Sequence, residues 1–449
     1  MSNGFKPYNR DQAFLLPPSM KDWLPPGDLA YFIVDLVETL DLSEIEQYYE
    51  IGKANSGQPP FHPKLMTGLL LYAYCLGTPS SRKIALKCER DIGYRIVSAD
   101  QQPNFRTLSE FRRIHLKPLE KLFVQVLHLA DEAGLVKLGH VALDGTKVHA
   151  NASKHKAMSY ARMCEKEAQY AKEVDELLRR AEATDEAEDR EYGAQKRGDE
   201  LPEELRFREK RLAKIREAKQ ALEERALEKA RAEGKLDAND QPIPPNPAGG
   251  GTKTPPGTPE PKAQRNFTDP ESPIMKMGDG SFDQAYNCQA AVDSAHQIIV
   301  AQDATDAAND KQQVVPMFEQ IKRNLGRRPK LGSADSGYYS ESNARYLRKR
   351  RIDDYLCPDR LRHGETPPPV RGPIPQGLSF IDRVRRKLMT QSGRRTYALR
   401  KQIVEPVFGQ IKHVRGLRQF LLRGLEKAQG EWSLWCTTHN LLKMWGANA

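Results

Sequence analysis

The stretch Leu138-Gly-His-Val-Ala-Leu-Asp144-Gly-Thr-Lys-Val148 decides the fold, because it sets a lone carboxylate at the end of an apolar run. The run Val141-Ala-Leu143 predicts a central strand of a sheet. Aspartate is depleted in strands, and its burial costs free energy unless a partner or a metal compensates it. Asp144 is therefore a candidate functional acid. An Asp-Gly pair between apolar residues is also a strong signal for a tight hairpin, so this stretch alone leaves a turn as the alternative.

The composition favours an intracellular protein with a polyanionic partner. Among 449 residues, 70 Lys and Arg stand against 60 Asp and Glu, a net charge of +10, although solubility alone would explain a surplus of this size. Six cysteines lie scattered without a Cys-x-x-Cys motif, as is typical of reduced thiols. We find no pattern of a signal peptide or a membrane span, so we expect a cytoplasmic protein without a membrane partner.

Residues 1–137 predict an all-helical N-terminal domain. Short apolar-periodic segments are separated by turns, and Thr107-Leu-Ser-Glu110 has the pattern of a capping box that opens a helix at Phe111. This arrangement resembles a helix-turn-helix bundle, in which basic side chains bind DNA phosphates. The candidate DNA contacts are Arg82, Lys83, Arg106, Arg112 and Arg113. The alternative for each of them is an ordinary solvated helix face.

Residues 155–235 predict a charged helical insertion. The segment is rich in Ala, Glu, Lys and Arg, is broken by glycines and Pro202 near its middle, and carries a sparse heptad-like stripe of Leu205, Leu212, Ile215 and Leu222. A short break between two helices favours an antiparallel coiled-coil hairpin that projects from the body. It would serve as a dimer contact, a DNA clamp or a plain spacer. Residues 236–265 are rich in Pro and Gly and predict a disordered linker.

The second half of the chain predicts alternating strands and helices. Strands are expected at 285–293, 297–302, 330–335 and 353–358, with helices at 310–325 and 340–350. Together with the Asp144 strand, three antiparallel strands precede parallel ones, which gives an α/β fold with a mixed sheet flanked by helices. That order matches the ribonuclease H arrangement. We therefore expect residues 138–154 and 266–449 to form one catalytic domain.

Three acids are candidates for a metal site. In the expected order the first and fourth strands are neighbours, so Asp144 and Asp335 would face each other, and a hard divalent cation would relieve their repulsion. Glu405 is the only acid between Arg383 and Arg423, a segment that holds 12 Lys and Arg. Glu405 and Lys412 share one helix face, which suits metal ligation beside a phosphate. The alternative is an ordinary ion pair between the two side chains on the surface. Pro406 predicts that this helix starts or kinks at Glu405.

These residues resemble the three acidic motifs of bacterial insertion-sequence transposases of the DDE type. The motifs are Leu143-Asp-Gly-Thr, Ala334-Asp-Ser-Gly-Tyr-Tyr, and Tyr397-Ala-Leu-Arg400 followed by Val404-Glu-Pro-Val-Phe-Gly-Gln-Ile-Lys412. The resemblance implies that Asp144, Asp335 and Glu405 are catalytic and bind metal, and that Tyr397, Arg400 and Lys412 contact DNA. One departure from the family pattern leaves open which basic residue belongs to the third motif. The family has three residues between its Arg and the Glu. Here Lys401 is separated from Glu405 by three residues, whereas Arg400 is separated from it by four.

The resemblance also implies an activity and partners. It predicts a DNA transposase that binds terminal inverted repeats and, with two Mg²⁺ or Mn²⁺ ions, cleaves DNA strands and transfers them to target DNA, acting as a homodimer or higher oligomer. One alternative is a structure-specific nuclease or resolvase on the same fold, which would cut without joining. Another is a catalytically inert DNA-binding scaffold.

Overall fold

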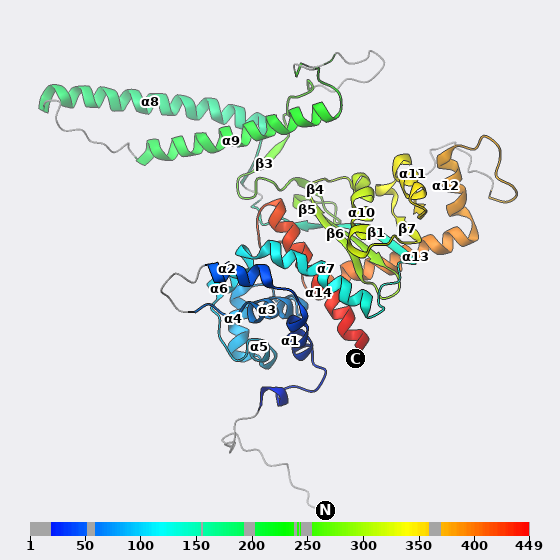
Figure 1. Ribbon diagram of the computed structural model, residues 1–449. Helices are drawn as coiled ribbons and strands as arrows, with labels where there is room; N and C mark the ends of the chain where they lie inside the picture. The colour runs from blue at the N-terminus through cyan, green and yellow to red at the C-terminus, as the bar shows by residue number, and fades with distance from the viewer. Residues whose placement is uncertain are drawn as a thin grey trace, which may run out of the picture.

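The computed structural model describes residues 19–51, 59–153, 156–192, 203–237, 240–241, 243, 254–358 and 370–448. Figure 1 shows a bundle of N-terminal helices, a mixed sheet with helices around it, and an arm of two long helices that projects from this body. The predicted mixed α/β class and the helical N-terminal region are thereby confirmed.

The N-terminal bundle is built around α3 (Pro63–Cys75), which is apolar on all sides. Leu69, Leu70 and Leu71 are all fully buried although they point in different directions around the helix axis, so neighbours must surround it. The surrounding elements are a short 3-10 turn (Met20–Asp22), α1 (Leu29–Thr39), α2 (Ser43–Ile51), α4 (Ser81–Arg90), α5 (Ile92–Val97), α6 (Phe105–Ile114) and α7 (Leu116–Glu132).

The predicted capping box is misplaced. Helix α6 begins at Phe105, because the Asn104 side chain accepts hydrogen bonds from the backbone N–H groups of Arg106 and Thr107. Thr107 therefore lies inside the helix instead of before it. Asparagine is as good an N-cap as threonine, and the chain uses the earlier of the two.

Strand β1 (His140–His149) lies in the centre of the mixed sheet, with an antiparallel neighbour on one side and a parallel neighbour on the other. On one side β1 pairs antiparallel with β5 (Phe282–Asp293), which pairs antiparallel with β4 (Ile274–Lys276) and β6 (Ile299–Thr305). On the other side β1 pairs parallel with β7 (Leu331–Ala334), and β7 with β8 (Asp353–Leu356). Asp144 lies in mid-strand opposite Ala290, so the hairpin-turn alternative is wrong.

Helix α14 (Leu425–Asn448) joins the bundle to the sheet. Every residue from Gly430 to Leu441 is buried, because α7 and α3 cover the helix on one side and β6 on the other. Its Trp432 indole N–H donates to the Gln289 carbonyl, and Trp435 packs against Tyr74 of the bundle. The remaining elements around the sheet are a 3-10 turn (Asp310–Gln312), α10 (Val314–Leu325), a 3-10 turn (Ser336–Tyr338), α11 (Glu341–Lys349), α12 (Phe380–Met389), α13 (Gln391–Gly409) and a π-helical turn (Gln410–Val414).

Helix α13 begins at Gln391 and continues through Pro406, so the predicted start at Glu405 is wrong, and the alternative of a kink stays a prediction. A proline inside a helix leaves the carbonyl four residues earlier without its backbone donor. Here that carbonyl belongs to Gln402, and the Gln297 side-chain amide donates to it at 3.0 Å. The partner comes from the turn between β5 and β6, far away in sequence. The irregularity appears only after Gly409, as the π-helical turn.

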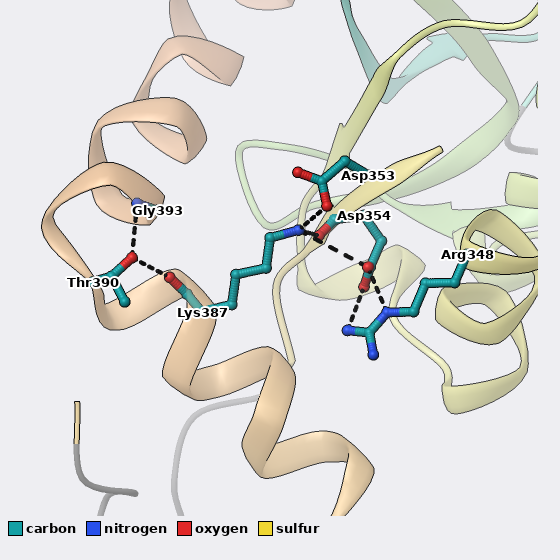
Figure 2. A network of polar contacts seen from close by, with 6 residues as sticks. All are labelled: Arg348, Asp353, Asp354, Lys387, Thr390 and Gly393. Carbon is teal, nitrogen blue, oxygen red and sulfur yellow. Dashed lines mark hydrogen bonds and ion pairs between the residues drawn. The ribbon is translucent and has the colours of Figure 1, made fainter. Parts of the chain in front are cut away.

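A polar network pins the start of α13 to the edge of the sheet (Figure 2). The Lys387 ammonium of α12 lies 2.6 Å from an Asp353 oxygen and donates to the Asp354 carbonyl at 2.7 Å. Arg348 holds the buried Asp354 carboxylate at 2.7 Å. Thr390 caps α13 and also donates to the Lys387 carbonyl. The α12–α13 corner is therefore fixed on β8.

The arm consists of two antiparallel helices on a small two-stranded ribbon. The ribbon pairs β2 (Ala157–Ser159) with β3 (Gln264–Asn266), and the helices are α8 (Tyr160–Tyr192) and α9 (Glu203–Ala232). Ion pairs fix the direction: Arg208 meets Glu173, whereas Lys219 meets Glu167. Supercoiling of the pair stays a prediction, and the predicted break at 193–202 lies outside the described residues.

Residues 254–265, which belong to the expected disordered linker, have an ordered structure next to the arm. The backbone N–H groups of Tyr160 and Ala161 donate to the carbonyls of Ala263 and Pro261, and β3 begins at Gln264. Apolar contact explains the difference, because Ala263 and Phe267 pack against Met163 and Ile215 of the arm. Residues 238–239, 242 and 244–253 of the expected linker lie outside the described residues.

Candidate active site

Asp144 is a half-buried carboxylate held by an arginine from α13. Its Oδ2 lies 3.0 Å from Arg400 Nη1, and the exposed fractions of the two side chains are only 19% and 9%. Its Oδ1 accepts from the Gly145 N–H at 2.8 Å. Burial raises the pKa of Asp144 to about 6, the charge of Arg400 opposes this rise, and Asp335 and Asp310 add to it. The site therefore concentrates negative charge.

Asp335 lies beside Asp144 because of the parallel register of their strands. Val141 pairs with Gly332 and Ala142 with Ser333, and both strands reach an aspartate two residues later. Asp335 Oδ1 accepts from the Gly337 N–H at 2.9 Å and caps the following 3-10 turn. Within the described part of the chain its second oxygen makes no hydrogen bond. The structure thus brings together the first two acids that the sequence singled out.

A third aspartate, Asp310, lies at the same place and was missed from the sequence. A Cβ built on Gly337 would meet Asp335 Oδ1 at 3.1 Å and Asp310 Oδ2 at 3.4 Å, so both carboxylates border one small space. The other oxygen of Asp310 accepts from Asn287 Nδ2 at 2.7 Å and from Gln289 Nε2 at 2.9 Å. Asn287 and Gln289 alternate with the apolar Tyr286, Cys288 and Ala290 in the middle of β5, and this polar face was the available signal.

Gly145 is required by the same network. A Cβ at this position would lie 2.6 Å from Gln289 Nε2, closer than side chains tolerate, and 3.0 Å from the Tyr338 hydroxyl, so the Gln289 amide would have to move away. The Tyr338 hydroxyl donates to Gln289 Oε1 and is buried. The Asp-Gly pair therefore does not form a turn. It lies within a strand whose backbone the Gln289 and Tyr338 side chains approach closely.

The basic residues of α13 and of the π-helical turn after it lie in different surroundings. Arg400 faces Asp144, with Tyr397 next to it at 5.8 Å from guanidinium carbon to ring centre. Lys412 Nζ donates to the Thr146 hydroxyl at 2.8 Å and to the Lys147 carbonyl at 2.9 Å. Lys401 is exposed. Of the two basic residues left open by the sequence, Arg400 is the one that contacts an acid of the site.

Glu405 is not brought to the two aspartates. Its side chain is exposed and forms no hydrogen bond or ion pair with any residue that the structure describes. No group of three acids, histidines or cysteines in the described ranges is close enough to hold a metal ion. Along the chain, however, Glu405 lies between Arg400 of α13 and Lys412 of the π-helical turn, which both contact β1.

A cavity of about 440 Å³ opens beside Asp310, and Asp144 and Asp335 are not among the described residues that line it. Asp310 and Asn287 line it on the side of the carboxylates, and Lys147, Lys276 and Lys412 line it elsewhere. Lysine ammonium groups are common ligands of phosphate, and carboxylates are ligands of hard cations. The cavity can therefore accept a phosphate group next to Asp310.

Two family models match the chain. Residues 18–113 match a model described as "Transposase domain (DUF772)", and residues 378–445 match one described as "Transposase DDE domain". Both matches support an insertion-sequence transposase of the DDE type. Searches of curated proteins and of solved structures found no match. The second model covers Glu405 and the basic residues of α13, whereas Asp144 and Asp335 lie outside both matched ranges of the transposase.

The basic residues expected to bind DNA in the transposase's N-terminal bundle do not share one environment. Arg82 and Arg106 are exposed, and their guanidinium carbons lie 5.3 Å and 5.8 Å from the centre of the Phe105 ring. Arg113 is exposed as well. None of the described helices of the transposase is both long and apolar enough to cross a membrane.

Arg112 is a correction to the expected DNA contacts. It is 4% exposed, and its guanidinium donates to the Tyr74 hydroxyl at 3.1 Å and to the Pro79 carbonyl at 2.8 Å. Its charge also opposes the rise in pKa of the buried Glu431 on α14, which burial brings to about 7. Arg112 therefore holds the bundle of the transposase against α14 and is not available to phosphates.

Arg112→Ala is expected to lower the free energy of unfolding by about 3 kcal/mol, because it leaves buried polar partners without a cation. The neighbouring variant Arg113→Ala removes an exposed side chain, and we expect a change below about 0.5 kcal/mol. Urea unfolding followed by circular dichroism measures both. Equal stability of the two variants would contradict the structural role of Arg112.

Proposed function

We propose that the transposase binds the terminal inverted repeats of its element and catalyses metal-dependent cleavage and transfer of DNA strands. The observation that carries the proposal is the parallel pairing of β1 with β7, which sets Asp144 next to Asp335 and beneath Arg400. The strand order β6-β5-β1-β7-β8, with three antiparallel strands followed by two parallel ones, supports a ribonuclease H-like catalytic domain. This domain would comprise residues 138–154 and 266–449.

The acids around Asp144 have the donor chemistry of a divalent-cation site, although no three of the described acids lie close enough to hold an ion in this structure. Asp144, Asp335 and Asp310 are close enough to influence one another's charge, and each offers hard oxygen atoms. One oxygen of Asp335 and one of Asp310 have no hydrogen-bond partner among the described residues. We propose Asp144, Asp335 and Glu405 as the ligands of two Mg²⁺ or Mn²⁺ ions. When bound there, the ions supply Lewis-acid stabilisation of the scissile phosphate and activation of the attacking oxygen.

We propose that Glu405 joins the two aspartates when DNA and cations bind. Arg400 of α13 and Lys412 of the π-helical turn both contact β1, so the helix segment between them lies along the same strand as Asp144. Glu405 lies on the exposed face, five residues after the inward-facing Arg400, so α13 would have to rotate to turn its side chain inward. Its exposure also explains why it can be recruited late, when DNA brings phosphate and cations to the α13 surface.

The basic side chains of α13 would hold the scissile strand. Arg400 neutralises Asp144 in the described structure and would exchange this partner for a phosphate oxygen when a cation takes the carboxylate. Lys412 lies on the cavity beside Asp310 and would bind the adjacent phosphate, and Tyr397 would pack against the sugar. The exposed Arg82, Arg106 and Arg113 would bind the repeats through the N-terminal bundle. Cutting two ends requires two active sites, so we expect a dimer or higher oligomer on DNA.

The purified full-length protein with a linear duplex that carries one end of its element tests the proposal. We expect strand cleavage at the end of the element with Mg²⁺ or Mn²⁺, no cleavage in excess chelator, and joining of pre-cleaved ends to a second duplex. Cleavage without joining would indicate a nuclease or resolvase. Binding without either reaction would contradict the proposed activity.

A further inference from the structure

We propose that a groove at the root of the arm binds DNA that has an unpaired base, with lysines and Arg211 on its phosphates and Phe207 stacked on the base. This inference rests on the proposed function, because it names where the arm contacts the DNA substrate. The groove lies between the first half of α9 and the β2–β3 ribbon, where the arm leaves the body (Figure 1).

The groove has a fixed apolar floor. Met158 of β2, Ile215 of α9 and Phe267 after β3 line it, and these three residues also belong to the apolar cluster that joins the arm to the ribbon. The volume of the groove is about 530 Å³, which is within the range of sites that bury a small molecule. A single nucleotide therefore fits without any change in the packing of the arm.

The rim of the groove is cationic. Lys156, Lys210, Arg211 and Lys214 line it, all four are exposed, and no acidic residue is among the described residues that line it. The three lysines form no ion pair with the described part of the chain, and Arg211 only lies over the Tyr170 ring at 5.6 Å. A site with this charge is complementary to a polyanion.

Three neighbouring cations of α9 differ from those of the groove, because they pair with acids of α8. Arg208 lies 2.9 Å from Glu173, and Arg216 and Lys219 lie 3.1 Å and 2.9 Å from Glu167. Those three are neutralised by α8, so they stabilise the arm itself. The groove cations lack such partners in the described structure and leave their charge for a ligand.

Phe207 decides between an ordinary basic surface and a base-stacking site. Its side chain is 60% exposed, and it lies on the same side of α9 as Lys210, Arg211 and Lys214, at spacings of three, four and seven residues. An exposed aromatic ring between cations is the combination that binds single strands, because the ring stacks on a base while the cations bind the backbone. The bases of an intact duplex are covered on both faces. The groove is therefore expected to prefer unpaired or frayed ends.

Binding of two fluorescent probes by the full-length protein tests the inference: a blunt duplex of about 30 base pairs, and the same duplex with a single-stranded overhang of about ten thymidines. We expect tighter binding of the overhang probe. Phe207→Ala should weaken binding of this probe about tenfold and leave binding of the blunt duplex unchanged. Lys210→Gln with Lys214→Gln should lower the slope of log affinity against log salt by about two, as two phosphate contacts would.

The matched control is Lys172→Gln with Lys229→Gln, which removes the same charge from exposed positions of the arm outside the groove. We expect this control to change neither the overhang preference nor the salt slope on the overhang probe. Equal effects of the two pairs would overturn the inference. A change in self-association of Phe207→Ala in sedimentation, without loss of DNA binding, would assign the groove to a second copy and would overturn it as well. Cleavage by the wild-type protein with Mg²⁺ reports separately on the proposed function.

Discussion

Asp335→Asn is expected to lower metal-dependent strand cleavage about a thousandfold or more, and to leave DNA affinity within about twofold. The asparagine carbonyl can still accept the hydrogen bond from the Gly337 N–H, so the 3-10 turn after β7 keeps its cap. What the variant loses is the charge that a divalent cation requires. Cleavage of an end-bearing duplex with Mg²⁺, compared with binding of the same duplex, separates the two effects.

Asp144→Asn and Asp353→Asn complete this experiment. Asp144→Asn should abolish cleavage in the same way, although it also removes the ion pair with Arg400. Asp353→Asn changes the same group on the adjacent β8, where the carboxylate is exposed and has Lys387 as its ion-pair partner among the described residues. Lys387 keeps its hydrogen bond to the Asp354 carbonyl, so the α12–α13 corner stays on β8 and cleavage should remain within about threefold of the wild type. Residual cleavage by either site variant within about tenfold of the wild type would exclude that aspartate from the reaction.

Glu405→Gln is expected to lower cleavage about a hundredfold to a thousandfold without changing the affinity of the DNA-free protein for Mn²⁺. The reason for this split is the exposed position of Glu405, which has no partner among the described residues and lies apart from the aspartates. Asp144→Asn, in contrast, should lose both cleavage and Mn²⁺ binding. Cleavage assays and calorimetric titration with Mn²⁺ in the absence of DNA measure the two quantities.

The control for Glu405→Gln is Glu426→Gln, which neutralises an exposed glutamate on α14 whose ion-pair partner in the described part of the chain is Lys117. It should leave cleavage and Mn²⁺ affinity unchanged. If Glu405→Gln weakened Mn²⁺ binding as much as Asp144→Asn, Glu405 would already be a ligand in the free protein. If it left cleavage intact, Glu405 would have no part in the reaction.

The strands and the pairing of the two aspartates could be predicted because their signals are local. Apolar runs such as Val141-Ala-Leu143 identify a central strand, and each run ends at a conspicuous acid. The order of antiparallel and parallel strands then places β1 beside β7 with few alternatives. Register follows from the alternation of side chains, so Asp144 and Asp335 arrive at the same level.

The errors arose where a distant residue changes the local preference. Pro406 is tolerated inside α13 because Gln297, more than a hundred residues away in sequence, donates to the Gln402 carbonyl. Arg112 looks like the exposed Arg113 beside it in the sequence, and only the packing of α14 and the bundle shows that it is buried. Asp310 begins a short turn without any strand signal, and it becomes part of the site through Asn287 and Gln289 of β5.

Iron-mediated cleavage of the protein backbone tests most directly whether the acids share a cation. Fe²⁺ enters oxygen-ligand Mg²⁺ sites, and with ascorbate and peroxide it generates radicals that cut the chain next to the bound ion. We predict cuts next to Asp144 on β1 and next to Asp335 after β7, further cuts next to Glu405 only when end DNA is bound, and loss of all cuts in excess Mg²⁺. Cuts confined to other parts of the chain, or cuts at only one of the two aspartates, would contradict the proposed metal site.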